Sequence, residues 1–315
     1  MSPPGGWPRL SLGCGNFGGI GSAPAFFGRG ASEQEAFAIM DAAHAGGIVW
    51  FDTADAYGGG ASETFIGRWR AARAPAGLLL TTKVFHSPHG DPRDRGLAPA
   101  RLAHSLEASL ERLGVERVDL YLAHEPDPET PIGETVEAFE ELRARGLIGA
   151  WGLSNVNAAG IGAALAYGRP ALVQNSYSLL ERADEAEVLP LCSAEGIAYV
   201  PYGPLAGGWL TGKYARGAAY PAGSRMTMRP EPYGRFAVED VFDGLESLAR
   251  EAARRGVESA ALAFAWVLAN PAVTGAVCGP SRPEQLDPVL AALALSLDAA
   301  ERAELGSYFK AVAWA

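Results

Sequence analysis

The chain places four polar residues at the ends of short apolar or glycine-bounded runs: Asp52, Tyr57, Lys83 and His124. Asp52 and Tyr57 fall in VWFDTADAYG, Lys83 in LLLTTKV and His124 in VDLYLAHEPD. Each run is typical of a short buried strand that ends in a polar loop. In a parallel sheet such strand ends meet at one rim, which is where α/β enzymes place their chemistry.

A tuned proton donor is the chemistry that these four side chains favour. A phenol has an ordinary pKa of ~10, and a neighbouring ammonium lowers it by stabilising the phenolate. Lys83 is the candidate ammonium, and Asp52 would keep it charged and in place. His124 could orient a substrate oxygen through a ring nitrogen. We therefore expect Tyr57 to act as a general acid toward a developing alkoxide, which is typically worth about 10²–10⁴ in rate.

Strand-like and helix-like segments alternate along the chain in the order that a (β/α)8 barrel requires. The predicted strands are residues 10–15, 48–52, 78–83, 118–123, 150–154, 172–175, 198–201 and 273–278. A helix capped by Ser32 is expected to end near residue 45. Six later helices are expected at 99–113, 132–145, 157–166, 238–255, 259–268 and 283–291. Three more are predicted at one end only: one begins at 62, one ends near 195 and one begins at 298. Residues 203–236 are rich in Gly, Pro and Arg, which predicts a long functional loop.

Composition agrees with one enzyme domain over residues 1–315. The chain has 315 residues, of which 48% are hydrophobic, and a single α/β barrel commonly uses this length. A formal net charge of −10 argues against nucleic acid and anionic membranes as partners. Three separated cysteines and the absence of a signal-peptide core in MSPPGGWPRL predict a reduced, cytoplasmic protein without a membrane span.

Several further motifs, taken with the first four residues, resemble those of the aldo-keto reductases. They are FDTADAYG, TK at 82–83, LAHEPD, WGLSN at 151–155, VQNSYSLL, PLAGGWLTGKY and GRF at 234–236. They span nearly the whole chain and are most similar to the bacterial and aflatoxin-aldehyde-reductase-like branches. The resemblance implies a single (β/α)8 TIM barrel that uses NADPH, and NADH less readily, to reduce an aldehyde or ketone. It also implies that the four residues above form the catalytic set.

The resemblance implies a cofactor site as well, built from Ser154, Asn155, Gln174, Tyr202, Gly203, Leu205, Gly207, Lys213, Arg225, Gly279, Ser281, Arg282 and Gln285. The first three would hold the nicotinamide carboxamide, and Tyr202 would stack on the ring, which fixes the face that delivers hydride. Residues 203–207 would wrap the diphosphate, because small residues let backbone N–H groups approach oxygen closely. Ser154 and Asn155 have an alternative role as caps of the helix that opens at Asn157.

The preference for NADPH is inferred from two arginines. A guanidinium binds a phosphate through paired hydrogen bonds, so Arg225 and Arg282 favour a cofactor with a 2′-phosphate. The sequence departs from the family pattern at Pro288 and Val289, where relatives often have Glu and Asn holding the adenine. We therefore expect adenine contacts that differ from those of such relatives.

Aromatic residues are expected to line the substrate pocket. The candidates are Phe26, Phe27, Phe85 and Trp209, together with Tyr57 and the loop after His124. Such walls suit a small carbonyl compound, and aldehydes, quinones, ketosteroids and sugars are all compatible with them. The same side chains could equally form core. No surface pattern favours one oligomeric state.

Two other patterns suggest chemistry that we reject. Residues 13–18 fit GxGxxG, but Gly and Pro follow and the first helical pattern starts near Ser32, so no dinucleotide-binding turn is expected there. His86, His89 and Asp91 resemble a metal cluster, yet they lie in a Pro/Gly-rich loop without further ligands nearby. We predict no metal site and assign this loop to substrate binding or to no function.

Two alternative functions use the same motifs. A low-turnover NADP(H)-binding sensor would keep the fold but would be expected to lose one of the four residues or to gain a partner-binding arm, and neither is present. An NAD-dependent alcohol or sugar dehydrogenase would run the reaction in the oxidative direction. The altered adenine motif leaves room for that second alternative, which the preference between NADPH and NADH distinguishes.

Overall fold

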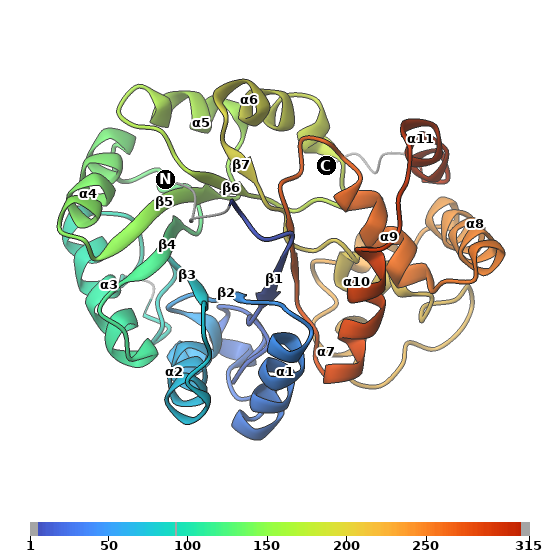
Figure 1. The fold of residues 1–315 in the computed structure, drawn as a ribbon, viewed down its shortest axis with the longest axis horizontal. Coiled ribbons are helices and arrows are strands. Elements are labelled where there is room, and N and C mark those ends of the chain that lie inside the picture. The colour runs from blue at the N-terminus through green and yellow to red at the C-terminus, as the bar shows by residue number, and fades with distance from the viewer. Residues whose placement is uncertain (1–5, 92, 310–315) are drawn as a thin grey trace.

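Eight parallel strands form the centre of the molecule, and helices surround them (Figure 1). The computed structural model describes residues 6–91 and 93–309. The strands are β1 (Leu10–Gly13), β2 (Trp50–Asp52), β3 (Leu79–Val84), β4 (Val118–Ala123), β5 (Ile148–Ser154), β6 (Leu172–Gln174), β7 (Ala198–Tyr199) and β8 (Ala276–Cys278). Their order is β7-β6-β5-β4-β3-β2-β1-β8, and each neighbouring pair runs parallel.

Backbone hydrogen bonds between the two ends of this sheet close it into a barrel. Thr274 N donates to Tyr199 O at 2.9 Å, and Val277 N donates to Pro201 O at 2.8 Å. Closure pairs the polar edges that an open parallel sheet would leave exposed. The predicted (β/α)8 barrel is therefore confirmed.

Eleven helices among the described residues pack around this barrel. They are α1 (Glu33–Ala45), α2 (Ala61–Arg73), α3 (Pro99–Leu113), α4 (Ile132–Ala144), α5 (Ala158–Leu165), α6 (Val188–Glu195), α7 (Arg225–Met228), α8 (Glu239–Arg255), α9 (Ser259–Leu268), α10 (Asp287–Ala292) and α11 (Ala299–Ser307). Ser32 caps α1 in a capping box with Glu35, as predicted. None of the helices in the described part of the chain is both long and apolar enough to cross a membrane.

The structure corrects three sequence predictions. The predicted helix at 283–291 is split into a 3₁₀ turn, Pro283–Leu286, and α10, because Pro288 fits only in the first turn of a helix. The segment 203–236 is not wholly irregular, since it contains α7 and two 3₁₀ turns, Ala206–Thr211 and Gly234–Phe236. Ser154 and Asn155 do not cap α5: Asn157 does so, with its side chain accepting from Gly160 N at 2.9 Å.

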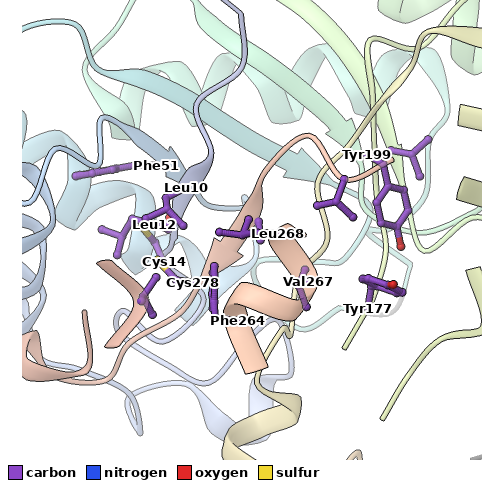
Figure 2. Packing of buried hydrophobic residues seen from close by; sticks show 14 of the residues in the cluster. Leu10, Leu12, Cys14, Phe51, Tyr177, Tyr199, Phe264, Val267, Leu268 and Cys278 are labelled. Carbon is purple, nitrogen blue, oxygen red and sulfur yellow. Dashed lines mark hydrogen bonds between the residues drawn. The ribbon is translucent and has the colours of Figure 1, made fainter. Parts of the chain in front are cut away.

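Two apolar layers hold the strands in place. The barrel interior is filled by Trp50, Leu120, Leu122, Ala150, Leu172, Ala198, Val200 and Val277. Trp7 packs against this interior where β2 begins, with its ring centroid 5.2 Å from that of Trp50. The second layer lies between strands and helices, and Figure 2 shows the part of it where Leu12, Cys278 and Phe264 lie near one another.

Candidate active site

The inward-facing positions of the strands change from apolar to polar at the carboxyl end of the barrel. Alternate strand residues point to the same side. Thus Leu120 and Leu122 fill the interior, and the next inward position of that strand is His124. Trp50 in the same way precedes Asp52. Strands β3, β5, β6 and β7 follow the same pattern. Their inward polar residues at this end are Lys83, Ser154, Gln174 and Tyr202.

Asp52, Lys83, Tyr57 and His124 come together at this end, as the sequence predicts. Lys83 Nζ forms a buried ion pair with Asp52 Oδ1 and donates to Thr53 O at 3.0 Å. It also lies 3.4 Å from Tyr57 Oη, which is in turn 3.4 Å from His124 Nε2. Lys83 is fully buried and Tyr57 is half-buried, so the phenol is the member of this set that faces outward.

Tyr57 owes its position to the glycines that follow it. Gly58 has φ +59°, a left-handed conformation that residues with a side chain rarely adopt. A Cβ at Gly58 would lie 2.6 Å from Phe17 O, which leaves no room for a side chain. The turn therefore requires glycine, and it connects the phenol to α2, which begins at Ala61.

The charges of the set differ in one respect from the prediction. Burial lowers the pKa of the Lys83 ammonium, but Asp52 and Tyr57 outweigh burial, so the pKa is raised and Lys83 stays charged. Burial raises the pKa of Tyr57, and Lys83 only partly opposes this. The predicted net lowering of the Tyr57 pKa is therefore wrong, although the predicted influence of Lys83 is present.

His124 is a neutral ring at neutral pH. Burial, Lys83 and His86 together hold its pKa well below the ordinary value. Its Nδ1 is buried without a hydrogen-bond partner among the described residues. A neutral imidazole beside a phenol can share a hydrogen bond with a substrate oxygen without adding a second positive charge.

The residues assigned to the nicotinamide form one hydrogen-bonded group next to the catalytic set. Ser154 Oγ donates to Gln174 O at 2.7 Å, and Gln174 Nε2 donates to Asp52 Oδ2 at 2.8 Å. Tyr202 Oη donates to Asn155 Oδ1 at 2.6 Å. Gln174 therefore links the candidate cofactor residues directly to the ion pair, a contact that the sequence did not indicate.

The segment 203–207 has the open backbone expected of a diphosphate-binding turn. Gly203 and Gly207 have φ +67° and +64°, and Leu205, between them, is half-buried against the core. A Cβ at Gly207 would lie 2.5 Å from the ring of Tyr233, so that residue must be glycine. Sequence reasoning missed Tyr233, which lies outside the motifs.

Basic side chains gather beside this turn. A Cβ at Gly208 would lie 2.2 Å from Lys213 Nζ, which places the ammonium against the backbone of the turn. Partial burial and the nearby charges of Arg225 and Arg282 lower the pKa of Lys213. Within residues 6–91 and 93–309, no carboxylate lies within ion-pair distance of Lys213 or Arg225. Such a cluster of cations suits an anion.

The loop after β8 holds the remaining cofactor candidates. Ser281 N and Oγ both donate to Gln285 Oε1, at 2.8 and 3.2 Å, while Gly279 and Arg282 are exposed. Val289 is buried in the core, so it does not face this loop. Val289, where the sequence departs from the family pattern, therefore packs in the core.

Two of the four substrate candidates, Phe27 and Phe85, lie beside neighbours of the four residues. A Cβ at Gly59 would lie 3.1 Å from the ring of Phe27, and the ring centroid of Phe85 lies 5.2 Å from that of His86. The ring of Phe26 lies 5.3 Å from the guanidinium of Arg229. Trp209 differs, because it is fully buried and does not face outward. It packs among four aromatic residues, three from the long segment and one from α8: Tyr214, Tyr220, Phe236 and Phe242.

His86 and Glu125 are polar residues next to His124. The His86 ring centroid lies 5.0 Å from that of His124, and His86 Nε2 lies 3.9 Å from Glu125 Oε1. Glu125 Oε1 also accepts from Asn155 Nδ2 at 3.1 Å. Within the described ranges, no three His, Cys, Asp or Glu side chains converge as a metal site. Sequence reasoning missed Glu125, although it directly follows His124.

Comparisons with known proteins give a consistent result. A sequence model of the Aldo/keto reductase family matches residues 9–308. The uncharacterized oxidoreductase YrpG of Bacillus subtilis (strain 168) is 36% identical over 86% of both chains. An NADH-specific methylglyoxal reductase of Escherichia coli (strain K12) is 33% identical over 90% of this chain and 89% of its own. The solved structure of the glycerol dehydrogenase AKR11B4 from Gluconobacter oxydans superposes with a TM-score of 0.82 at 28% identity, covering 98% of this chain and 93% of that one.

Proposed function

The chain belongs to the aldo-keto reductase family, and from that premise we propose that it reduces an aldehyde or ketone to an alcohol with NADPH. One observation carries the proposal. The Tyr57 hydroxyl lies 3.4 Å from both the buried ammonium of Lys83 and the neutral ring of His124. In that arrangement Tyr57 is a proton donor, Lys83 stabilises the phenolate that remains, and His124 orients the substrate oxygen that accepts the proton.

The chain's own residues account for the proton half of the reaction. Reduced nicotinamide, when bound, supplies the hydride that adds to the carbonyl carbon. Tyr57 then donates its proton to the carbonyl oxygen as negative charge develops there, and Lys83 stabilises the phenolate that remains. Asp52 keeps Lys83 charged, and His124 orients the oxygen by a hydrogen bond. A proton from solvent restores the phenol.

The basic cluster supports NADPH as the cofactor. Lys213, Arg225 and Arg282 lie close enough to influence one another electrostatically, beside glycines whose open backbone suits a diphosphate. A 2′-phosphate would neutralise this cluster, whereas NADH lacks that group. Ser154, Asn155, Gln174 and Tyr202 would hold the nicotinamide.

A second candidate function has specific support. The Escherichia coli relative is named NADH-specific, and the structural neighbour is a glycerol dehydrogenase. An NAD-dependent dehydrogenase that oxidises a small alcohol would use the same four residues, with the Tyr57 phenolate accepting the hydroxyl proton of the alcohol. Cofactor preference and reaction direction separate the two candidates.

Loss of NADPH absorbance against small and bulky aldehydes and ketones tests the proposal directly. We expect kcat/KM to be at least about tenfold higher with NADPH than with NADH, because one charge-assisted phosphate contact is worth that much. Glycerol with NAD⁺ or NADP⁺ provides the reverse reaction. Quenching of tryptophan emission by NADPH without turnover of any carbonyl compound would contradict the reductase proposal and favour a sensor.

Replacing Arg225 with glutamine should weaken NADPH binding about tenfold or more and leave NADH binding nearly unchanged, because only NADPH carries the 2′-phosphate. Fluorescence titration with both cofactors measures this difference. Arg216→Gln is the matched control, since Arg216 lies in the same long segment but pairs with Glu239 and Asp243. Equal weakening of both cofactors in Arg225→Gln would show that Arg225 does not recognise the 2′-phosphate.

A cytoplasmic location is part of the same proposal. Cys14, Cys192 and Cys278 are free, buried thiols. Free thiols without a disulfide are typical of proteins in a reducing compartment, where NADPH is also available.

A further inference from the structure

The loop between β3 and α3 lies beside His124, one of the four candidate catalytic residues. This β3–α3 loop, residues 85–91 and 93–98, carries Phe85 and His86, and the His86 ring lies against His124. Its outer end is held by Asp127, whose Oδ2 accepts from Leu97 N at 2.7 Å. The inner end of the loop, at Phe85 and His86, is held by a different contact.

Arg101, in the first turn of α3, provides that contact. It donates to Asp55 Oδ2 at 3.3 Å and to His86 O at 3.2 Å, and it pairs with Asp94 at 3.0 Å. The Arg101 guanidinium therefore joins two residues of the loop, His86 and Asp94, to the carboxyl group of Asp55. Arg101 is 12% exposed and Asp55 1%, so little solvent screens the pair.

Asp55 in turn is fixed to the strand that carries the catalytic lysine. Its backbone N donates to Lys83 O at 3.0 Å, and its Oδ2 also accepts from Ser105 Oγ at 3.0 Å. The chain of contacts thus runs from Lys83 through Asp55 and Arg101 to the backbone of His86. Asp55 and Arg101 touch none of the four catalytic side chains in these contacts.

We propose that Asp55 and Arg101 are positioning residues for substrate, which hold the β3–α3 loop at the distance from His124 that carbonyl binding needs. The inference rests on the proposed function for its kinetic consequence, but the anchoring itself does not depend on activity. A largely buried guanidinium that donates to Asp55 Oδ2 and to His86 O, and that pairs with Asp94, fixes the relative position of the two loops through directional, charge-assisted contacts.

A second buried ion pair on the same helices provides a matched control. Arg112, also on α3, pairs with Glu63 on α2 at 2.7 Å, and Thr82 Oγ1 donates to Glu63 at 2.5 Å. Glu63 is fully buried, as Asp55 is. Among residues 85–91 and 93–98 of the β3–α3 loop, none forms a hydrogen bond or ion pair with Arg112 or Glu63. Loss of this pair therefore measures the general cost of breaking a buried ion pair on α3.

Limited digestion of the folded protein with trypsin tests the anchoring without an activity assay. Arg93 and Arg95 lie in the loop and are exposed, with 89% and 56% of their side chains accessible. We expect cleavage after these two residues to be about tenfold faster in Arg101→Gln and Asp55→Asn, because one charge-assisted hydrogen bond is worth roughly that factor. Arg112→Gln should cleave there at the wild-type rate. Equal acceleration in Arg112→Gln, or none in Arg101→Gln, would overturn the proposal.

Steady-state kinetics give the second readout. Arg101→Gln should raise KM about tenfold while kcat changes by less than about threefold, because the loop binds substrate and the proton donor is untouched. Arg101→Lys should recover part of the KM, since it keeps the charge. A fall in kcat at constant KM would contradict a positioning role. A wild-type protein that reduces no carbonyl compound would contradict the proposed function alone, since digestion still decides the anchoring.

The pH dependence of KM provides a third readout. Burial and Glu63 raise the pKa of Asp55 to about 7, opposed by Arg101, Ser105 and Arg112. Above pH 7 Asp55 is ionised and the pair with Arg101 is complete, whereas below pH 7 protonation weakens it. KM should therefore rise as the pH falls through about 7, and Asp55→Asn should remove this inflection. Persistence of the inflection in Asp55→Asn would assign it to another group.

Other titratable groups lie near Asp55 and Arg101. Tyr121 on β4 faces Asp55 and Arg101, but burial raises its pKa well above the ordinary value. Asp94 lies on the loop itself and pairs with Arg101. Burial and the charges of Arg95 and Arg229 lower the pKa of His86 from its ordinary value. Loss of the inflection in Asp55→Asn is therefore the result that assigns it to Asp55.

Discussion

Replacing Tyr57 with phenylalanine is expected to lower kcat for carbonyl reduction by about 10²–10⁴. The change removes one oxygen atom, the one that lies 3.4 Å from Lys83 Nζ and 3.4 Å from His124 Nε2. Without it no group of matched position can protonate the developing alkoxide. NADPH affinity should stay near the wild-type value, because the residues proposed to hold the cofactor are untouched. Single-turnover oxidation of bound NADPH measures the step directly.

Tyr220→Phe is the matched control for that experiment. Tyr220 packs in the aromatic cluster around Trp209, away from the four catalytic residues. Its loss of a hydroxyl should leave kcat within about twofold of wild type, as expected for a substitution away from the site. Undiminished turnover in Tyr57→Phe would refute Tyr57 as the proton donor and would leave His124 as the candidate to test next.

Replacing Lys83 with methionine should both destabilise the protein and inactivate it. Methionine fills a similar volume but leaves the carboxylate of Asp52, which is 3% exposed, without its counter-charge. Breaking a buried pair in this way typically costs about 3–5 kcal/mol of unfolding free energy. The pKa of Tyr57, which Lys83 now lowers against the effect of burial, would rise further. Urea unfolding and kcat/KM measure the two effects separately.

The double variant Asp52→Asn/Lys83→Met separates the structural role of the pair from its chemical one. Replacing both charges removes the unpaired carboxylate, so most of the lost unfolding free energy should return. Activity should not return, because the ammonium beside Tyr57 is still missing. Recovery of activity along with stability would mean that Lys83 supports the fold and has no effect on proton transfer.

The grouping of Asp52, Tyr57, Lys83 and His124 and the barrel that carries them could be predicted from the sequence, because local patterns determine both. Short apolar runs ending in Asp52, Lys83 and His124 indicate buried strands, and Ser32 with Glu35 indicates a helix start. The family motifs supply their order. Reading each strand at every second residue would also have placed Ser154, Gln174 and Tyr202 on the inner face without any resemblance.

Other features could not be predicted, because they depend on contacts between distant segments. The contact between Arg101 and His86 O joins a helix to a loop backbone, and nothing in either local sequence signals it. The pKa of Tyr57 was predicted from its charged neighbour alone, whereas burial of the phenol decides the net direction. Trp209 looked like a pocket wall, because a sequence does not distinguish an aromatic residue of a pocket from one of a core.

The side chains that handle the proton and those proposed to hold the cofactor lie on opposite halves of the barrel. Asp52, Lys83 and His124 follow β2, β3 and β4, while the proposed cofactor residues follow β5 to β8. Two of the proposed cofactor residues join the two sets: Gln174 through Asp52, and Asn155 through His124, whose backbone O accepts from Asn155 Nδ2 at 2.9 Å. Engineering a different cofactor preference away from these two residues therefore changes one half of the barrel and leaves the acid chemistry intact. Substitutions on the two halves should combine with nearly additive free energies, provided that Gln174 and Asn155 are kept.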